Sequence, residues 1–171
     1  TYREAMVPKE LPKKLLVIGS GAIGAEFASF YNALGSDVTI VEVLPQILPV
    51  EDTEVSEFVR NEFEGRGITI MTATRVESLT STKKGLVAKI SSENGSEENI
   101  FDRAILAVGV TGNVENLGLE TTSVTTEKGS IVVNEWLETE EEGIYAIGDV
   151  AGAPVSYTHL RAHETRHDLV C

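Results

Sequence analysis

The fold of this chain is decided by residues 13–42, which read KKLLVIGSGAIGAEFASFYNALGSDVTIVE. An apolar run leads into the pattern G-x-G-x-x-G at Gly19, Gly21 and Gly24. An amphipathic segment and a second apolar run follow, and the second run is followed directly by an acid, Glu42. A strand, a glycine-rich turn, a helix and a second strand that ends at an acid are typical of a βαβ unit that binds a dinucleotide.

Each glycine of the motif has its own physical role. Gly19 permits the tight turn out of the strand, Gly21 lets a pyrophosphate approach the backbone, and Gly24 lets the helix pack closely on the sheet. The helix N-terminus offers N–H groups and a partial positive charge to the phosphates. Glu42 lies 18 residues beyond Gly24, near the spacing of about 20 for an acid that accepts from ribose hydroxyls. The alternative, a glycine-rich turn in an α/β protein without a cofactor, stays open.

The charges around Glu42 bear on the choice between NAD and NADP. An NADP site supplies a cation to the 2′-phosphate, whereas an acid accepts hydrogen bonds from the free ribose hydroxyls of NAD. The sequence has no Lys or Arg between Lys14 and Arg60. A phosphate beside Glu42 would meet a like charge, so we expect NAD rather than NADP unless a residue distant in sequence folds in.

The composition disfavours several classes of partner. The chain has 171 residues, a formal net charge of −13 and acidic clusters at 93–102 and 135–142, which disfavour nucleic acid and anionic membranes. No apolar run approaches the roughly 20 residues that span a bilayer, and no signal peptide opens the sequence. A single cysteine, Cys171, excludes an internal disulfide framework. We therefore expect a cytoplasmic protein with no nucleic-acid partner and no membrane partner.

Hydrophobic periodicity predicts two helices, over 22–34 and 51–66. The apolar side chains expected on their buried stripes are Ile23, Phe27, Tyr31 and Leu34 in the first helix, and Val55, Phe58, Val59 and Phe63 in the second. Residues 1–12, which include Pro8 and Pro12, are expected to form a connector.

Short apolar or alternating runs between turn residues predict strands. They fall at 14–18, 37–43, 68–71, 73–80, 85–91, 99–107, 129–134 and 144–147. The three runs within 73–107 follow one another with only short turns between them, which indicates a β-meander in place of a third helix. The expected fold class is α/β, a Rossmann-like dinucleotide-binding domain with a parallel sheet and a β-meander.

Four stretches of this sequence together resemble the NAD-binding part of the pyridine nucleotide–disulfide oxidoreductase family. They are LLVIGSGAIGAEFA at 15–28, VTIVEVLPQILP at 38–49, DRAILAVGVTGNVENLGLE at 102–120 and EEGIYAIGDVAGAP at 141–154. Their order and spacing match the family over about residues 1–154. The AVGVTGN segment departs from the AVGRRPN that is more common in the family, and it resembles the dihydrolipoamide dehydrogenases more than the glutathione or mercuric reductases.

The resemblance implies roles for eight residues. It implies that Gly19, Gly21 and Gly24 bind the NAD pyrophosphate and that Glu42 binds the adenosine ribose. It also implies that Val76 contacts the adenine side, that Glu26 lies near the nicotinamide and the flavin, and that Gly109 lets the backbone approach the nicotinamide half. In the FAD part, it implies that Asp149 hydrogen-bonds the ribityl chain of FAD. Without it, Glu26 is an exposed helical acid, Val76 is an ordinary strand residue, and Gly109 and Asp149 are turn residues.

The resemblance also implies a domain organisation and an activity. Residues 1–12 would end an FAD domain, 13–132 would form the NAD-binding domain, and 133–154 would return into the FAD domain. The parent protein would be a homodimer that oxidises dihydrolipoamide on a lipoyl domain of a 2-oxo acid dehydrogenase complex and, through FAD, reduces NAD⁺. The cysteine pair and the His–Glu pair that the family uses in catalysis match nothing here, so we expect no catalytic residues and no activity from the chain alone. The alternatives are another FAD-dependent disulfide reductase and a non-catalytic NAD-binding sensor.

Residues 155–171 differ abruptly in composition from what precedes them. All three histidines and the cysteine fall in the last 13 residues, and the string resembles translated sequencing-adapter read-through, so we expect a non-native origin. His159, His163, His167 and Cys171 recur every fourth residue, as metal ligands on a helix can. Four such ligands would span about 18 Å, which is too far for one ion, so no metal site is expected.

Overall fold

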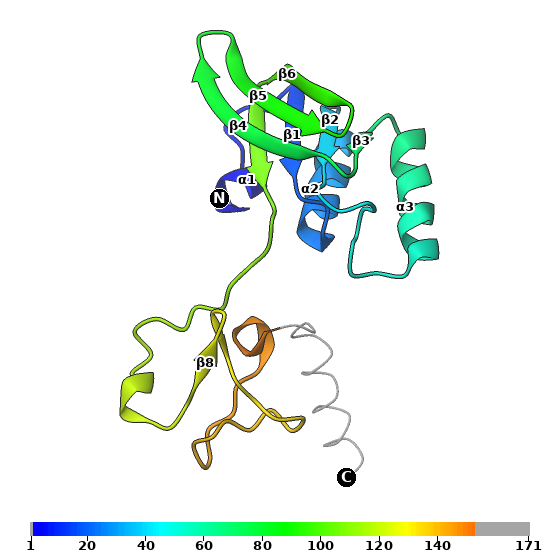
Figure 1. The fold of residues 1–171 in the computed structure, drawn as a ribbon. Coiled ribbons are helices and arrows are strands. Elements are labelled where there is room, and N and C mark those ends of the chain that lie inside the picture. Colours follow the sequence, from blue (N-terminus) through cyan, green and yellow to red (C-terminus); the bar gives the residue numbers. More distant parts are fainter. Residues whose placement is uncertain (1, 153–171) are drawn as a thin grey trace. The chain divides into compact units, whose positions relative to one another are not determined.

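The computed structural model describes residues 2–152. The chain divides between Gly109 and Val110 into two compact units (Figure 1), which are described separately. The expectations for residues 155–171, namely a non-native origin and no metal site, lie outside the described residues. The boundaries expected at 12, 132 and 154 stay predictions. Among the described residues, no helix has the length and apolar character needed to cross a membrane.

A four-stranded parallel sheet forms the centre of the first unit. Its strand order is β3-β2-β1-β7. The strands are β1 (Lys14–Ile18), β2 (Asp37–Val41), β3 (Thr69–Met71) and β7 (Arg103–Leu106). Because the strands are parallel, the carboxyl ends of β1, β2 and β7 meet at one edge of the sheet, which is the edge where open α/β sheets bind ligands.

The central strands are apolar at nearly every position because both faces of the sheet are covered. On one face, Leu15 and Val17 of β1 pack with α2 (Ala22–Ala33) and α3 (Thr53–Gly65). On the other face, Leu16 packs against the antiparallel meander. The meander consists of β4 (Arg75–Thr82), β5 (Gly85–Ser92) and β6 (Gly95–Phe101). The expected fold class is therefore confirmed (Figure 1).

The buried stripe expected for α2 is wrong in two of its four positions. Ile23 and Leu34 are exposed, and the helix instead buries Gly24, Ala25, Ala28 and Tyr31. Small side chains on this face let the helix axis approach the sheet closely, and Ile23 and Leu34 lie outside it.

The stripe expected for α3 is also only half correct. Phe63 is buried and Val59 packs beside the core, whereas Val55 is exposed and Phe58 is 68% exposed. A serine takes the buried position in the first turns, since the Ser56 hydroxyl donates to the Ile47 carbonyl oxygen at 2.7 Å. A hydrogen bond to the preceding loop therefore decides which way this helix faces, a feature that hydrophobic periodicity does not report.

The single strand expected over 99–107 is two strands that belong to different sheets. The break falls at Asp102, between β6 of the meander and β7 of the parallel sheet. The Asp102 carboxylate accepts from the backbone N–H groups of Lys13 and Lys14 at 2.8 and 2.9 Å. These bonds fix the point where the chain leaves the meander and enters the parallel sheet beside β1.

Protonation of Asp102 should weaken this junction. The backbone N–H of Lys14 lowers the pKa of the carboxyl below its ordinary value of 3.8; partial desolvation opposes this, and the Lys13 N–H and the Lys13 and Arg103 charges support it. A folded-state pKa below the unfolded one stabilises the fold above the unfolded value, and that contribution is lost as the pH falls through the folded pKa. We expect Asp102→Asn to lower the melting temperature at neutral pH and the deficit to shrink below about pH 4. Thermal unfolding of the unaltered and Asp102→Asn chains between neutral pH and about pH 3 measures the difference in melting temperature. A difference that does not change with pH would contradict the role of the ionised Asp102 carboxylate.

The second unit has little regular structure in its described part. It contains the short hairpin β8 (Thr126–Glu127) and β9 (Ser130–Ile131) and the 3₁₀ turns η1 (Leu119–Thr121) and η2 (Gly148–Ala151). The strands expected at 129–134 and 144–147 are therefore mostly wrong. The first shrinks to β9, and the second makes one isolated bridge, between Tyr145 and Glu138. A strand requires a partner backbone along its length, and these apolar runs find one for only one or two residues.

The connector expected at 1–12 contains a short helix, α1 (Tyr2–Met6), which its sequence did not suggest. The Tyr31 hydroxyl of α2 donates to the Ala5 carbonyl oxygen at 2.6 Å and holds this helix in place. A cavity of about 660 Å³ lies between the connector and β7, lined by residues such as Glu10, Tyr31 and Leu106. None of the residues expected to bind NAD lines this cavity.

Candidate dinucleotide-binding site

The glycine-rich turn begins at Gly19, directly after β1. Gly19 has φ +94°, a conformation that L side chains rarely adopt, and a Cβ at this position would overlap the carbonyl oxygen of Ala107. A Cβ on Gly24 would overlap the carbonyl oxygen of Gly19. The turn, the start of α2 and the end of β7 are thus packed backbone against backbone, as expected for the first and third glycines of the motif.

The middle glycine faces open space. A Cβ built on Gly21 has no heavy atom within 4 Å, so the backbone here is accessible to a ligand. Gly21 is the N-cap of α2, and no side chain caps that helix end. The contrast is α3, whose N-cap Asp52 accepts from the Glu54 N–H at 2.9 Å. The N-terminus of α2 therefore keeps N–H donors and a partial positive charge that a phosphate can use.

Glu42 follows β2 and turns its side chain to the glycine-rich turn. The residue is only 5% exposed. Oε2 accepts from the backbone N–H and the hydroxyl of Ser20 at 2.8 and 2.7 Å, and Oε1 accepts from the Leu44 N–H at 2.9 Å. The structure thus brings the acid and the glycine motif together. Ser20, which joins them, is a residue that the sequence analysis did not single out, and nothing in its spacing identifies it.

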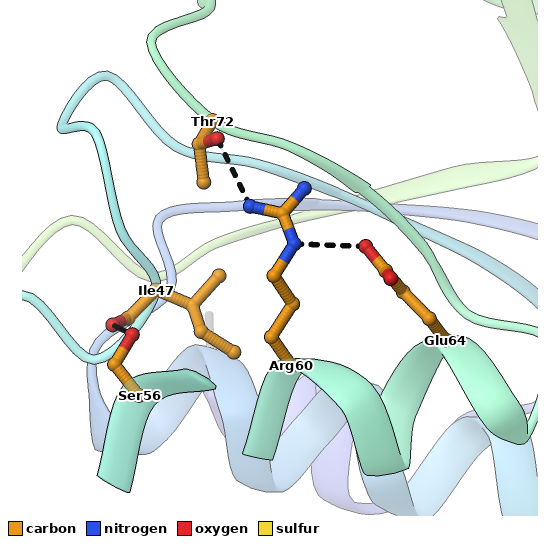
Figure 2. Close-up of polar contacts among 5 residues, drawn as sticks. All are labelled: Ile47, Ser56, Arg60, Glu64 and Thr72. Atoms are coloured by element: carbon orange, nitrogen blue, oxygen red, sulfur yellow. Dashed lines mark hydrogen bonds and ion pairs between the residues drawn. The ribbon is translucent and has the colours of Figure 1, made fainter. Parts of the chain in front are cut away.

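The loop after Glu42 is held from two sides. The Leu48 N–H donates to the Ser20 carbonyl oxygen at 2.9 Å, which ties the loop to the glycine-rich turn. Figure 2 shows the second tie, where Ser56 of α3 donates to the Ile47 carbonyl oxygen. The loop that continues from the acid is therefore positioned by hydrogen bonds at its middle.

Arg60, the first cation after Lys14 in the sequence, is engaged elsewhere. Figure 2 shows its guanidinium between Glu64 and Thr72, with Nε 2.9 Å from Glu64 Oε1 and Nη1 3.3 Å from Thr72 Oγ1. The pair with Glu64 lies one turn apart on α3 and is partly exposed. Arg60 thus reaches Thr72 in the segment that follows β3, and its charge is paired with the Glu64 carboxylate on its own helix.

Three further candidates belong to the first unit. Glu26 lies in α2 and is exposed, two residues beyond Gly24, the last glycine of the motif. Val76 lies in β4 and is half-buried against the cluster around Leu16. Gly109 has φ +133° and open space where a side chain would be, two residues beyond the Ala107 carbonyl that touches the turn. Glu26 and Gly109 are thus close in sequence to residues of the glycine-rich turn or to residues that touch it, whereas Val76 lies in the meander.

The remaining candidate belongs to the second unit. Asp149 lies in η2, whose neighbours Val150 and Ala151 pack beside the buried Val124, Ile131 and Ala146. It is not among the residues that the first unit brings together. Its expected role toward FAD stays a prediction.

The geometry defines the class of protein: a dinucleotide-binding α/β domain, with an uncapped helix N-terminus and a fixed acid at the carboxyl edge of a parallel sheet. Comparison with known proteins then identifies the family. The chain belongs to the pyridine nucleotide-disulphide oxidoreductase family, whose pattern matches residues 1–165. The resemblance drawn from the four sequence stretches is thereby confirmed.

This chain matches only part of the length of each of its named relatives. The dihydrolipoyl dehydrogenase of Rhizobium etli is 47% identical over an alignment of 173 positions, which covers 100% of this chain and 35% of the relative. The HOCl-induced flavoprotein disulfide reductase RclA of Escherichia coli is 28% identical with a TM-score of 0.78, over 95% of this chain and 37% of that one. An engineered NADPH oxidase, derived from the Lactobacillus brevis NADH oxidase, is 27% identical with a TM-score of 0.68, over 82% and 30%. The chain spans about a third of the length of the curated relatives that it matches.

Proposed function

We propose that this chain is the NAD-binding portion of a flavin-dependent dihydrolipoyl dehydrogenase, which oxidises dihydrolipoamide and reduces NAD⁺. The observation that carries the proposal is the Glu42 carboxylate fixed beside the open backbone of Gly21. The acid after β2 suits the ribose of an adenosine diphosphate group, and the glycine-rich turn after the neighbouring β1 suits its phosphates. The 47% identity to a dihydrolipoyl dehydrogenase supports the choice of enzyme within the family.

The open space at Gly21 and the uncapped N-terminus of α2 support NAD binding by the first unit. In this proposal Gly19, Gly21 and Gly24 form the pyrophosphate turn, and Glu42 binds the adenosine ribose. NAD, when bound, supplies the hydride-accepting nicotinamide, and this chain's own residues bind and orient it. Val76 is proposed on the adenine side, and Glu26 and Gly109 on the nicotinamide side.

The wider parts of the proposal concern the parent protein. FAD would be held mostly by regions of the parent protein other than this sequence, and Asp149 would contact the ribityl chain of FAD. The partner would be a lipoyl domain of a 2-oxo acid dehydrogenase complex, the parent would be a homodimer, and its location would be cytoplasmic. Another disulfide reductase, such as one related to RclA, is the second candidate, and the likeness to RclA at 28% identity favours it less than the first.

A preference for NAD over NADP follows from the charges at the site. A 2′-phosphate would approach a buried carboxylate, and Arg60 is already paired with Glu64. The engineered NADPH oxidase supports the same reasoning. It carries a Gly→Ala substitution, then eighteen residues later an Asp→Ala followed directly by Ala→Arg and Met→Ser, and a Pro→Arg five residues further. The same spacing in this chain joins Gly24, Glu42 and Pro49.

Calorimetric titration of the 171-residue chain with NADH and with NADPH tests the proposed function. We expect NADH to bind roughly tenfold more tightly or better, since losing a hydrogen bond and gaining like-charge repulsion exceeds about 1.4 kcal/mol. Glu127→Gln removes an exposed acid in the second unit and should leave both affinities unchanged. Equal or tighter binding of NADPH would contradict the proposal.

A further inference from the structure

Ser20, between the first two glycines of the motif, uses all of its polar groups within the site. Its side chain is 1% exposed. The backbone N–H and the hydroxyl both donate to Glu42 Oε2, at 2.8 and 2.7 Å. Its carbonyl oxygen accepts from the Leu48 N–H at 2.9 Å. One residue therefore connects the glycine-rich turn, the acid and the loop that follows the acid.

The hydrogen bonds to Glu42 leave a defined acceptor position on the carboxylate. An ionised carboxylate has about four lone-pair sites and no donor. In the described part of the chain, Ser20 fills both sites of Oε2, and Leu44 fills one site of Oε1. What remains is an acceptor position on Oε1, which suits a hydroxyl donor. A phosphate brings only acceptors and negative charge at neutral pH, so this position does not suit it.

We propose that Ser20 is a positioning residue that holds the Glu42 carboxylate so that Oε1 is presented to a ribose hydroxyl of NAD. The inference rests on the proposed function and adds a specificity-determining residue to it. Without the hydroxyl the carboxylate keeps one donor on each oxygen, the Ser20 N–H on Oε2 and the Leu44 N–H on Oε1. The hydroxyl adds a third hydrogen bond, and this bond further restricts rotation of the carboxylate. A carboxylate that rotates also exposes its charge in more than one direction, so its discrimination between NADH and NADPH weakens.

Two serine substitutions separate this role from a general loss of buried contacts. Ser20→Ala removes the hydroxyl and keeps the backbone N–H. Ser36→Ala is the matched control, because Ser36 is also buried and its hydroxyl also makes one hydrogen bond, to the Pro12 carbonyl oxygen at 2.6 Å. Ser36 precedes β2 and so lies at the opposite edge of the sheet from Glu42. Ser20→Gly is the second variant, since it removes the hydroxyl together with the Cβ.

Calorimetry on the 171-residue chain, with NADH and NADPH as the probes, measures the effect. We expect Ser20→Ala to weaken NADH binding by on the order of tenfold, as for one hydrogen bond to a charged group, and to leave NADPH binding nearly unchanged. Ser36→Ala should change neither affinity. In the Glu42→Gln background, Ser20→Ala should add little further loss, because the group that it positions has been altered.

The outcomes distinguish this inference from the proposed function. If Glu42→Gln weakens NADH binding but Ser20→Ala and Ser20→Gly do not, the role of Ser20 is overturned and the proposed function stands. The same holds if Ser20→Ala weakens NADH and NADPH equally, or adds fully to Glu42→Gln, since a merely structural role gives that result. If Glu42→Gln leaves NADH binding unchanged, both the role of Ser20 and the assignment of the ribose site are overturned.

Discussion

Gly19→Ala is expected to lower the melting temperature by on the order of 10 °C or more, while Gly21→Ala leaves it almost unchanged. At Gly19 a methyl group meets both a φ of +94° and the Ala107 carbonyl oxygen. The backbone strain and the overlap together cost about 2–5 kcal/mol, which is a large share of a domain's stability. At Gly21 the methyl group points into open space, so the folded state has nothing to displace.

Ligand binding should show the reverse order for Gly21. A methyl group there occupies the space through which a pyrophosphate reaches the backbone, so we expect NADH to bind roughly 10- to 100-fold more weakly. Gly65→Ala, in the last turn of α3 and also facing open space, is the control: it should leave NADH binding unchanged and, because alanine favours a helix over glycine, raise the melting temperature by about 2–4 °C at most. Thermal unfolding and calorimetry on the same four chains make the measurement. If the Gly21→Ala chain binds NADH as tightly as the unaltered chain, the glycine-rich turn does not bind the pyrophosphate of NAD.

The second large effect is a change of cofactor preference. Val43 follows the acid directly and is 54% exposed, so an arginine at this position can stay solvated. Replacing Glu42 by alanine at the same time removes the buried charge that opposes a phosphate. We expect the double variant Glu42→Ala, Val43→Arg to weaken NADH binding and strengthen NADPH binding, each by roughly tenfold, so that the preference inverts.

The single substitutions show which part of the change matters. Glu42→Arg should also narrow or invert the preference, but it places a cation at a position that is 5% exposed and therefore costs stability. Val43→Arg alone keeps the acid, so NADH should still bind more tightly. Titration of the variants with both cofactors measures the ratio. A double variant that retains the original preference would show that selectivity lies elsewhere than in the loop after β2.

The arrangement of the glycine motif and Glu42 could be predicted from the sequence because parallel strand order alone brings these residues together. β1 and β2 are neighbours, and both end at the same edge of the sheet. The hydrogen bonds of Ser20 could not be predicted, since the direction of one serine hydroxyl depends on where the acid's side chain turns. The pairing of Arg60 with Glu64 and Thr72 depends in the same way on how α3 lies against the segment after β3.

The errors in the fold have physical causes that local sequence does not contain. Periodicity weights large apolar side chains, but α2 buries Ala25 and Ala28 because close approach to the sheet requires small ones. The split at Asp102 depends on the N–H groups of Lys13 and Lys14, which lie 89 and 88 residues earlier in the sequence, at the start of β1. In the second unit, apolar runs such as 144–147 extend only as far as a partner backbone accompanies them.

Amide chemical shifts of the isotope-labelled chain, followed during titration with NADH, test the central claim most directly. We expect the largest changes on Gly21, on the first residues of α2 and on Leu44, whose N–H donates to the Glu42 carboxylate. The meander turns at 83–84 and 93–94 should not respond. NADH-induced changes confined to the meander or to the second unit, with Gly21 and Leu44 unaffected, would contradict the assignment of this edge of the sheet as the dinucleotide site.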